Sequence, residues 1–179
     1  MRKTIKILSL LTGFSVTLHA EVPSVSFNGI KYVLATVAVD KGGSGTITNE
    51  YVPQGETIDS WTTLLAVRYW PKVKKVGDAT GPWVKMIHPL LCRNLGVFAR
   101  NDNDVLLEAW LAAPNRSYIE IDLHRFVVEP GTDGVKGYQF AQKILMTGGA
   151  GNPTSYMKSR GTLFTEIGKL RLTAVRREN

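Results

Sequence analysis

The fold is decided between residues 105 and 145, where the sequence reads VLLEAWLAA (105–113), YIEIDLHRFVVE (118–129) and VKGYQFAQKIL (135–145). Apolar and polar residues alternate along the middle run, so an extended chain would have one apolar face and one polar face. Alternation with a period of two is typical of a strand that buries one face. The apolar face holds Ile119, Ile121, Leu123 and Val127, and the polar face holds Glu120, Asp122 and His124.

Short clusters of turn-forming residues separate these runs: PNRS (114–117) after the first and PGTDG (130–134) after the second. Proline fixes its own φ, whereas asparagine and glycine accept the positive φ values that tight turns require. The pattern predicts an antiparallel meander. The fold class is therefore α+β, with an antiparallel, mostly meander sheet of about six strands, one helix from the N-terminal half and a C-terminal amphipathic helix.

Strand-like runs also precede this stretch, at KYVLATVAV (31–39), TITNEYV (46–52) and TLLAVRYW (63–70). The glycine-rich residues 40–45 predict a hairpin loop between the first two. Neither face of 63–70 is clearly polar, so we expect a central strand that is covered on both sides.

Two helices are expected. The first is predicted over residues 82–88, resuming to Arg93, with Thr80 or Gly81 as N-cap and Pro82 at the first helical position. The second starts at Asn152-Pro153 and continues to about Leu172. Its apolar stripe is Tyr156, Leu163, Ile167, Leu170 and Ala174.

The N-terminus has the layout of a secretory signal peptide. A basic start (Arg2, Lys3, Lys6) is followed by the apolar run ILSLLTGFSV (7–16) and by Ala20, after which we expect cleavage. Residues 1–20 are then the signal peptide, and residues 21–179 form a single exported domain, periplasmic or secreted. No later run is long enough for a membrane span.

Composition gives little support for a nucleic-acid partner. The formal net charge is +7, and the predicted signal peptide carries three of these positive charges. The remaining excess is ordinary for a soluble domain. No P-loop, no Gly-x-Ser-x-Gly elbow and no His-Glu-x-x-His motif occurs, so we expect no cofactor and no familiar catalytic site.

Cys92 is the only cysteine, which excludes an internal disulfide. It follows the apolar residues 87–91, so we expect a buried, inert thiol, with an intermolecular disulfide as the alternative. His88 lies in the same apolar context and is expected to be a core histidine. A Cys92–His nucleophile pair stays open, although no protease signature surrounds it.

Glu120, Asp122 and His124 are the residues best placed for catalysis or metal binding, because alternate side chains on a strand lie about 6.6 Å apart. Glu108 on the neighbouring strand could join them. The simpler expectation is a solvated sheet face, because no second histidine and no metal-ligand spacing accompanies the three residues. We therefore assign no catalytic or metal residue, and keep these three as the candidates.

Five aromatic residues could line a pocket or an exposed patch: Trp61, Tyr69, Trp70, Trp83 and Trp110. Of these, Trp61, Trp70 and Trp110 are the candidate binding residues, because exposed aromatic side chains are enriched in binding hot spots. The competing expectation is that the tryptophans belong to the core. Two loops, residues 40–45 and 72–77, could instead protrude and block the active site of another protein.

Residues 49–66 (NEYVPQGETIDSWTTLLA) resemble small exported bacterial proteins of unknown function. These carry a strand, a Pro-x-Gly-Glu-Thr break and a Trp-Thr strand entry, here 53–57 and 61–62. Later they have a long charged strand, here 118–129, and an aromatic-Ala-x-Lys strand, here 138–144. Some resemble the Mog1/PsbP-like fold, an antiparallel sheet flanked by helices. The resemblance implies a fold and a compartment, with no catalytic residue.

Together these features favour an exported, non-catalytic binding module, such as an envelope or secretion accessory protein. Its expected partner is another envelope or secreted protein. The first alternative is an inhibitor or immunity protein against a secreted enzyme. The second is a hydrolase or metal-dependent enzyme that uses Glu120, Asp122 and His124. Convergence of these three side chains in a concave pocket would favour the last alternative.

Overall fold

A computed structural model describes residues 22–93, 95–113, 115, 117–146 and 153–176. The predicted signal peptide (1–20) and the glycine-rich segment 147–151 lie outside the described residues.

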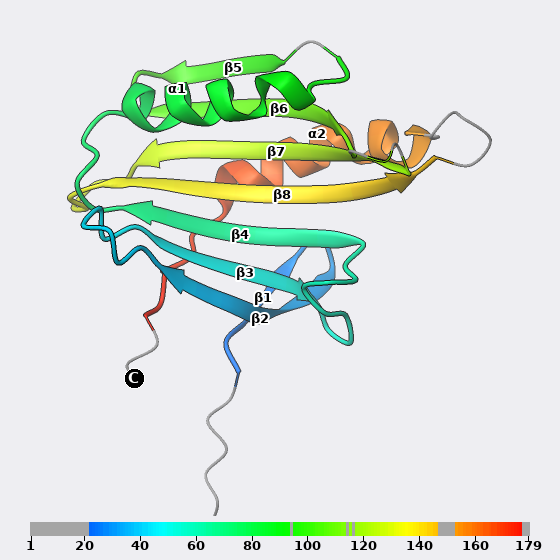
Figure 1. The fold of residues 1–179 in the computed structure, drawn as a ribbon, viewed down its shortest axis with the longest axis horizontal. Helices are drawn as coiled ribbons and strands as arrows, with labels where there is room; N and C mark the ends of the chain where they lie inside the picture. Colours follow the sequence, from blue (N-terminus) through cyan, green and yellow to red (C-terminus); the bar gives the residue numbers. More distant parts are fainter. Residues whose placement is uncertain (1–21, 94, 114, 116, 147–152, 177–179) are drawn as a thin grey trace, which may run out of the picture.

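The described residues form one antiparallel sheet of eight strands in the order β1-β2-β3-β4-β8-β7-β6-β5 (Figure 1). The sheet joins two four-stranded meanders, β1–β4 and β5–β8, along the β4–β8 pairing, where Thr63 lies opposite Gln142. The α+β class is confirmed, with eight strands rather than about six. The strands are β1 (Ser24–Phe27), β2 (Ile30–Val39), β3 (Ile47–Pro53), β4 (Thr63–Trp70), β5 (Gly96–Asn101), β6 (Asp104–Ala112), β7 (Tyr118–Val128) and β8 (Val135–Leu145).

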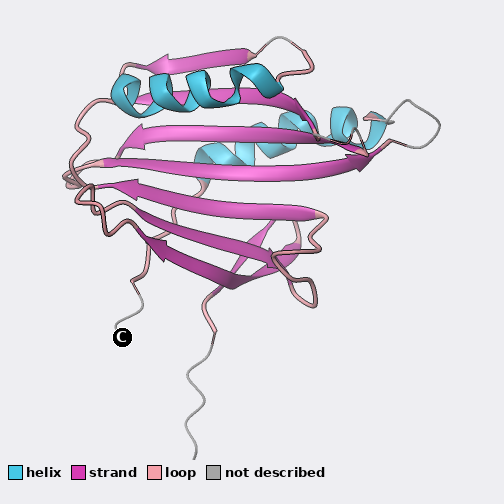
Figure 2. Cartoon of the chain, in the orientation of Figure 1, coloured by secondary structure: helices cyan, strands magenta, loops and turns pink. Residues whose placement is uncertain are grey.

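Two α-helices cover opposite faces of this sheet (Figures 1 and 2). Helix α1 (Val76–Ile87) contacts β6 and β7 on one face and continues into the short 3-10 helix η1 (His88–Leu90). Helix α2 (Thr154–Lys169) contacts β7 and β8 on the other face. Strand β7 is therefore covered on both sides. Its side chains contribute to two separate environments, one under α1 and one under α2.

Helix α1 begins six residues before the predicted start, and Pro82 lies inside it rather than at its first position. A proline in a helix interior removes a backbone hydrogen bond and disfavours the helix. Val76 and Ala79, both N-terminal to Pro82, are buried against Leu107. Because tertiary packing supplies most helix stability in proteins, this packing outweighs the proline, which is exposed.

Helix α2 ends at Lys169, before the predicted end, and the chain then runs extended along the sheet. Leu170 still packs in the core, so the apolar stripe predicted for one helix is shared by a helix and an extended tail. Asn49 of β3 holds that tail at Val175. Its amide Nδ2 donates to the Val175 carbonyl (3.0 Å), and its Oδ1 accepts from the Val175 N–H (2.7 Å).

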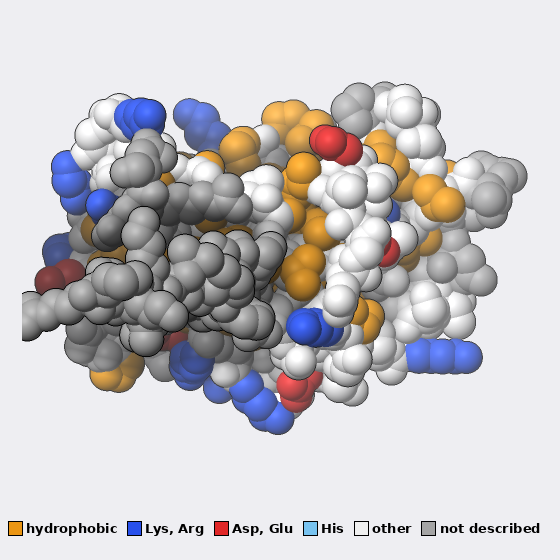
Figure 3. Space-filling model, turned by 90° about the horizontal axis from the view of Figure 1, so that it is seen from below, with side chains coloured by type: hydrophobic (Ala, Val, Ile, Leu, Met, Phe, Trp, Pro, Cys, Tyr) orange, Lys and Arg blue, Asp and Glu red, His pale blue; other side chains and the backbone are white. Residues whose placement is uncertain are grey.

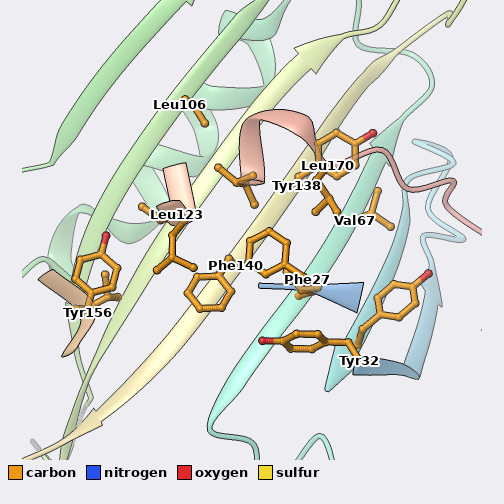
Figure 4. Close-up of a cluster of buried hydrophobic side chains, with 14 of the residues drawn as sticks. Phe27, Tyr32, Val67, Leu106, Leu123, Tyr138, Phe140, Tyr156 and Leu170 are labelled. Carbon is orange, nitrogen blue, oxygen red and sulfur yellow. The ribbon is translucent and has the colours of Figure 1, made fainter. Parts of the chain in front are cut away.

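The main core lies between the sheet and α2 (Figure 4). Ile121 and Leu123 of β7 supply its centre, which confirms the predicted apolar face of that strand. Strand β1 also reaches this core, since the Phe27 ring stacks on Phe140 with centroids 5.4 Å apart. Burying a large apolar side chain contributes about 1.5–3 kcal/mol, so this face supplies most of the stability.

The α1 face holds a smaller cluster around Phe126, with Trp70 and Trp83 packed against it. The Trp70 ring lies over Gly137, where any Cβ would approach the ring to 2.7 Å. Strand β4, which bears Trp70, is central and largely buried, as predicted.

Neither helix among the described residues has the length and hydrophobicity to cross a bilayer. Seen from below, basic side chains are spread around the outline of the molecule rather than gathered into one patch (Figure 3).

Candidate functional site

Glu120, Asp122 and His124 share the face of β7 that looks toward α1. Trp83 of α1 lies against the His124 ring, with centroids 4.1 Å apart. Asp122 and His124 are 3% and 2% exposed. The expected solvated face is therefore wrong at these two positions, because α1 covers the part of the sheet that carries them.

A cavity of about 320 Å³ opens beside these residues, between the sheet and α1 with η1; we call it the α1 cavity. Its polar residues come from three adjacent strands: Arg68 of β4, Gln139 of β8, and Glu120 with Asp122 of β7. Its other lining residues are Trp83, Met86, Ile87, Leu90, Leu111, Ala112, Ala113 and Tyr118. Two of the three candidate residues thus converge in a concave site with apolar walls.

Asp122 lies at the end of a short polar chain. Arg68 Nη1 donates to Gln139 Oε1 (2.6 Å), and the Gln139 side chain hydrogen-bonds to the Asp122 carboxyl group. One carboxyl oxygen of Asp122, Oδ1, is buried and has no hydrogen-bond partner among the described residues. A buried acceptor without a partner costs about 1–3 kcal/mol, so this atom favours a ligand that donates to it.

Burial and mutual repulsion hold a proton on the Glu120–Asp122 pair. Burial is the main cause that raises the pKa of Glu120, and the charge of Asp122 and their hydrogen bond add to it. Burial likewise raises the pKa of Asp122, opposed by hydrogen bonds from Gln139 and Glu120 and by the charge of Arg68. Because two adjacent carboxylates resist ionising together, the pair retains one proton at neutral pH.

His124 does not take part in the cavity. Its Nε2 lies 3.5 Å from Asp122 Oδ2, a long contact. Burial, with the charge of Arg68, holds the pKa of His124 well below its usual range, so the imidazole is neutral and the contact is no ion pair. Among the described residues, no three His, Cys, Asp or Glu side chains are grouped to hold a metal ion.

Glu108 does not join this group, because it faces α2 on the opposite side of the sheet. Its carboxylate accepts hydrogen bonds from Tyr156 (2.6 Å) and from Arg160 (2.6 and 3.0 Å). Glu108 belongs to the packing of α2.

Sequence reasoning missed Arg68 and Gln139, which complete the cavity together with Trp83, one of the aromatic residues expected to line a pocket or the core. Arg68 did carry a signal, because it is an arginine in a strand expected to be covered on both sides. Arginine is seldom buried unless it has a partner. Gln139 carried no comparable signal, since its role depends on where α1 lies on the sheet.

Trp61, Trp70 and Trp110 do not form one surface. Trp110 is buried beside Tyr156 on the α2 face, whereas Trp70 stacks on Phe126 on the α1 face. Trp61 packs over a third cluster with Leu64, Ala66 and Ala141. Their dispersion removes the support for a shared tryptophan patch.

A cation of the chain itself, Lys143, flanks the α1 cavity beside the wall residue Tyr118, and we call this side of the cavity its rim. Lys143 lies opposite Glu120 in the β7–β8 register. Its Nζ is 3.7 Å from the Trp61 ring centroid and 5.3 Å from that of Tyr118. An ammonium over aromatic faces is a favourable arrangement, and Tyr118 is also part of the cavity wall.

Cys92 is exposed, contrary to the expected burial. The apolar run that suggested burial leaves the sheet at η1, where His88 and Leu90 are also exposed. The thiol instead donates to the Trp110 carbonyl (3.2 Å). His88 and Cys92 line a common shallow hollow on the surface, so His88 is not a core histidine.

A larger, shallower hollow of about 660 Å³ lies at the β5–β6 turn. Its carboxylates are already paired: Asp104 accepts two hydrogen bonds of 2.9 Å from Arg125, and Glu129 accepts from Lys136 and Tyr138. One nitrogen of Arg125, Nη1, is buried with no partner among the described residues. The saturated carboxylates favour a structural role for this hollow.

A family model matches residues 20–172 of the chain. No curated protein and no solved structure matches it, and the resemblance to Mog1/PsbP-like proteins is not confirmed. The matched range includes every strand and helix described above and all residues of the α1 cavity. Over residues 20–172, the chain belongs to this uncharacterised family.

Proposed function

We propose that the protein is an exported, non-catalytic binding module that holds a small ligand in the α1 cavity. The observation that carries the proposal is Asp122 Oδ1, a buried acceptor without a partner among the described residues, in a side chain that lines the cavity. The large majority of buried polar groups are hydrogen-bonded, and at Asp122 the exception lies in a residue that also lines a cavity with polar and apolar walls. An acceptor left open beside a cavity supports ligand binding.

The size and lining of the cavity support the same function. Small-ligand sites occupy about 300–1,000 Å³ and combine apolar walls with a few placed polar groups. At about 320 Å³ the α1 cavity suits a ligand at the lower end of this range. Arg68, Asp122 and Gln139 supply the polar groups, while Trp83 and Leu90 supply apolar wall.

The binding test uses two methionines as reporters. Met86 lines the cavity and Met157 lies on α2; they are 66% and 51% exposed. In protein labelled with ¹³C at the methionine methyls, a panel of fragment-sized compounds should shift the Met86 resonance and leave Met157 unchanged. Leu90→Trp should fill the mouth of the cavity and abolish the shift, and Ile30→Trp at the far edge should not. A panel that leaves Met86 unmoved contradicts the proposal.

The export part of the proposal rests on the N-terminus. The basic start and the short apolar run have signal-peptide character, and the family match begins at residue 20, four residues after the apolar run ends. Intact-mass measurement of the protein recovered outside the cytoplasm should give a chain that begins at Glu21. A protein that keeps Met1 and stays in the cytoplasm would refute export.

Proton transfer is the second candidate function, because Glu120 and Asp122 share a proton and line the same cavity. Such a pair could act as general acid and base on a bound substrate. Glycosidases use two carboxyl groups that stand apart on either side of the substrate. Glu120 and Asp122 are hydrogen-bonded to each other, so they do not have this arrangement. If a compound found through Met86 is converted, and Glu120→Gln binds it without conversion, the protein is an enzyme.

The inhibitor alternative receives less support from the two loops that suggested it. Lys72 Nζ donates to the Gly43 carbonyl, so residues 40–45 and 72–77 are tied to one another. Lys74 Nζ similarly donates to the Asp133 carbonyl. A loop that blocks an active site should project from the domain, whereas these loops are fastened to it.

A further inference from the structure

We propose that the ligand of the α1 cavity is a small organic cation with an apolar body, whose ammonium or amidinium group donates to Asp122 Oδ1. This inference rests on the proposed function and names the chemical class of the ligand. It follows from three features: the open acceptor, the charges around it and the walls that face it.

The open acceptor selects a donor. An ionised carboxylate only accepts hydrogen bonds, so Asp122 Oδ1 is satisfied by an N–H or O–H group of the ligand. A carboxylate or phosphate on the ligand would bring another acceptor to the same place. Anionic ligands are therefore disfavoured at this end of the cavity.

The surrounding charges favour a donor that is also a cation. The lining carries two carboxyl groups, Glu120 and Asp122, and one guanidinium, Arg68. Arg68 Nη1 donates to Gln139, so the Arg68 guanidinium acts on Asp122 through its charge and not through a direct hydrogen bond. A hydroxyl and an ammonium can both donate to an ionised carboxylate, but only the ammonium adds the attraction between opposite charges, so a cation stabilises this carboxylate more than a hydroxyl does.

The walls suit a cation that carries an apolar group. Trp83 and Tyr118 present aromatic surface to the cavity, and Met86 and Leu90 complete it with flexible apolar side chains. Lys143 already places its ammonium over Trp61 at the rim, within 5.3 Å of the Tyr118 ring centroid. The Tyr118 ring, which is part of the wall, thus lies near one organic cation of the chain itself, as expected for an aromatic face that attracts cations.

Binding of a cation should release the proton that the carboxyl pair holds. The groups facing the pair are His124 of β7, Arg68 of β4, and Gln139 and Lys143 of β8; α1 contributes Trp83 and no charged residue to the lining. A bound cation stabilises both carboxylates in their ionised forms, and thereby takes the place of the proton. Binding should then be coupled to the release of up to one proton and weaken as the pH falls.

Benzylammonium, benzyl alcohol and benzoate form a matched set of cationic, neutral and anionic probes with the same apolar body. We expect benzylammonium to bind at least about tenfold more tightly than the other two at pH near 8, with a weaker affinity near pH 6. Titration calorimetry in two buffers that differ in ionisation enthalpy measures the proton release. Met86 and Met157 methyl shifts locate the binding.

Asp122→Asn should weaken benzylammonium binding by about tenfold or more, and Glu120→Gln should abolish the proton release while leaving the cation preference. Lys143→Gln should tighten binding, because it removes a like charge from the rim. Glu166→Gln on the exposed side of α2 serves as the matched control and should match the parent protein. Circular dichroism establishes that each variant is folded.

The outcomes separate this inference from the function on which it rests. If neutral or anionic compounds move Met86 and cations do not, the cation inference is overturned and small-ligand binding stands. Unchanged benzylammonium affinity in folded Asp122→Asn also overturns it. If no compound of any charge moves Met86, both proposals fail.

Discussion

Two carboxylates on neighbouring strands of the same sheet have opposite environments. Glu108 of β6 faces α2 and is 5% exposed, while Asp122 of β7 faces α1 and is 3% exposed. Glu108 accepts from Tyr156, Arg160 and the Trp110 indole (3.4 Å). Asp122 is approached by side chains but keeps Oδ1 without a partner among the described residues.

The difference shows that the number of hydrogen-bond donors, rather than burial, decides whether the pKa of a buried carboxyl group is lowered or raised. Burial alone would raise the pKa of Glu108, yet hydrogen bonds from Arg160, Tyr156 and Trp110 outweigh it and lower that pKa. Burial prevails at Asp122 and raises its pKa, because its donors are too few. We take the saturated carboxylate as part of the fold and the unsaturated one as part of a binding site.

The largest effect is expected at Glu108. Glu108→Gln removes the anion that Arg160 and Tyr156 require and leaves them with a poorer acceptor. Breaking a buried ion pair costs about 3–5 kcal/mol, and we expect about 3 because the Arg160 side chain is one-third exposed. Urea unfolding measures the loss, with Glu166→Gln as the exposed control. A loss below about 1 kcal/mol would mean that the network does not hold α2.

A smaller effect of opposite sign is expected at Asp122. Asp122→Asn keeps the shape and removes a buried charge that has too few donors around it. We expect the free energy of unfolding to stay unchanged or rise by about 1 kcal/mol, as is common when binding residues are replaced. The same urea experiment tests it. A loss comparable to that of Glu108→Gln would show that Asp122 serves the fold, and the contrast between the two faces would collapse.

The third effect concerns pH and Glu120. Burial, helped by Asp122, raises the pKa of Glu120 to about 8. Between its unfolded pKa of about 4.3 and that value, the native state holds a proton that the unfolded chain has lost. Stability should therefore fall as the pH rises through this window. In Glu120→Gln the fall should be shallower, as urea unfolding at several pH values will show; parallel curves for variant and parent would contradict the assignment.

The sequence predicted the class of fold but not its full extent. Strand β7 was predicted correctly because its apolar and polar residues alternate. The apolar face packs in the core under α2, and the opposite face is polar. Strand β1 was missed, although Asn28-Gly29 is the type of turn that joins two strands, with φ of 49° and 77°. The start of α1 was misplaced because Pro82 was given more weight than the burial of Val76, which only the folded sheet provides.

The candidate site was predicted in part. That Glu120, Asp122 and His124 share a face follows from the period of two along a strand. Helix α1 covers this face, keeps His124 buried and neutral, and encloses Glu120 and Asp122 in a cavity. These effects depend on tertiary packing, which leaves no periodic pattern in the sequence. Arg68 lies far from these residues in sequence, and the β4–β8 pairing brings it near.

The seam between β4 and β8 has a consequence for the order of folding. Every other pairing in the sheet joins strands that follow one another along the chain, whereas this one joins residues far apart in sequence. Closing a long loop costs more entropy than closing a hairpin, and distant pairings slow folding. We expect each meander to assemble first and the seam to set the rate. The α1 cavity draws Arg68 from one half and Asp122 from the other, so it is completed only when folding ends.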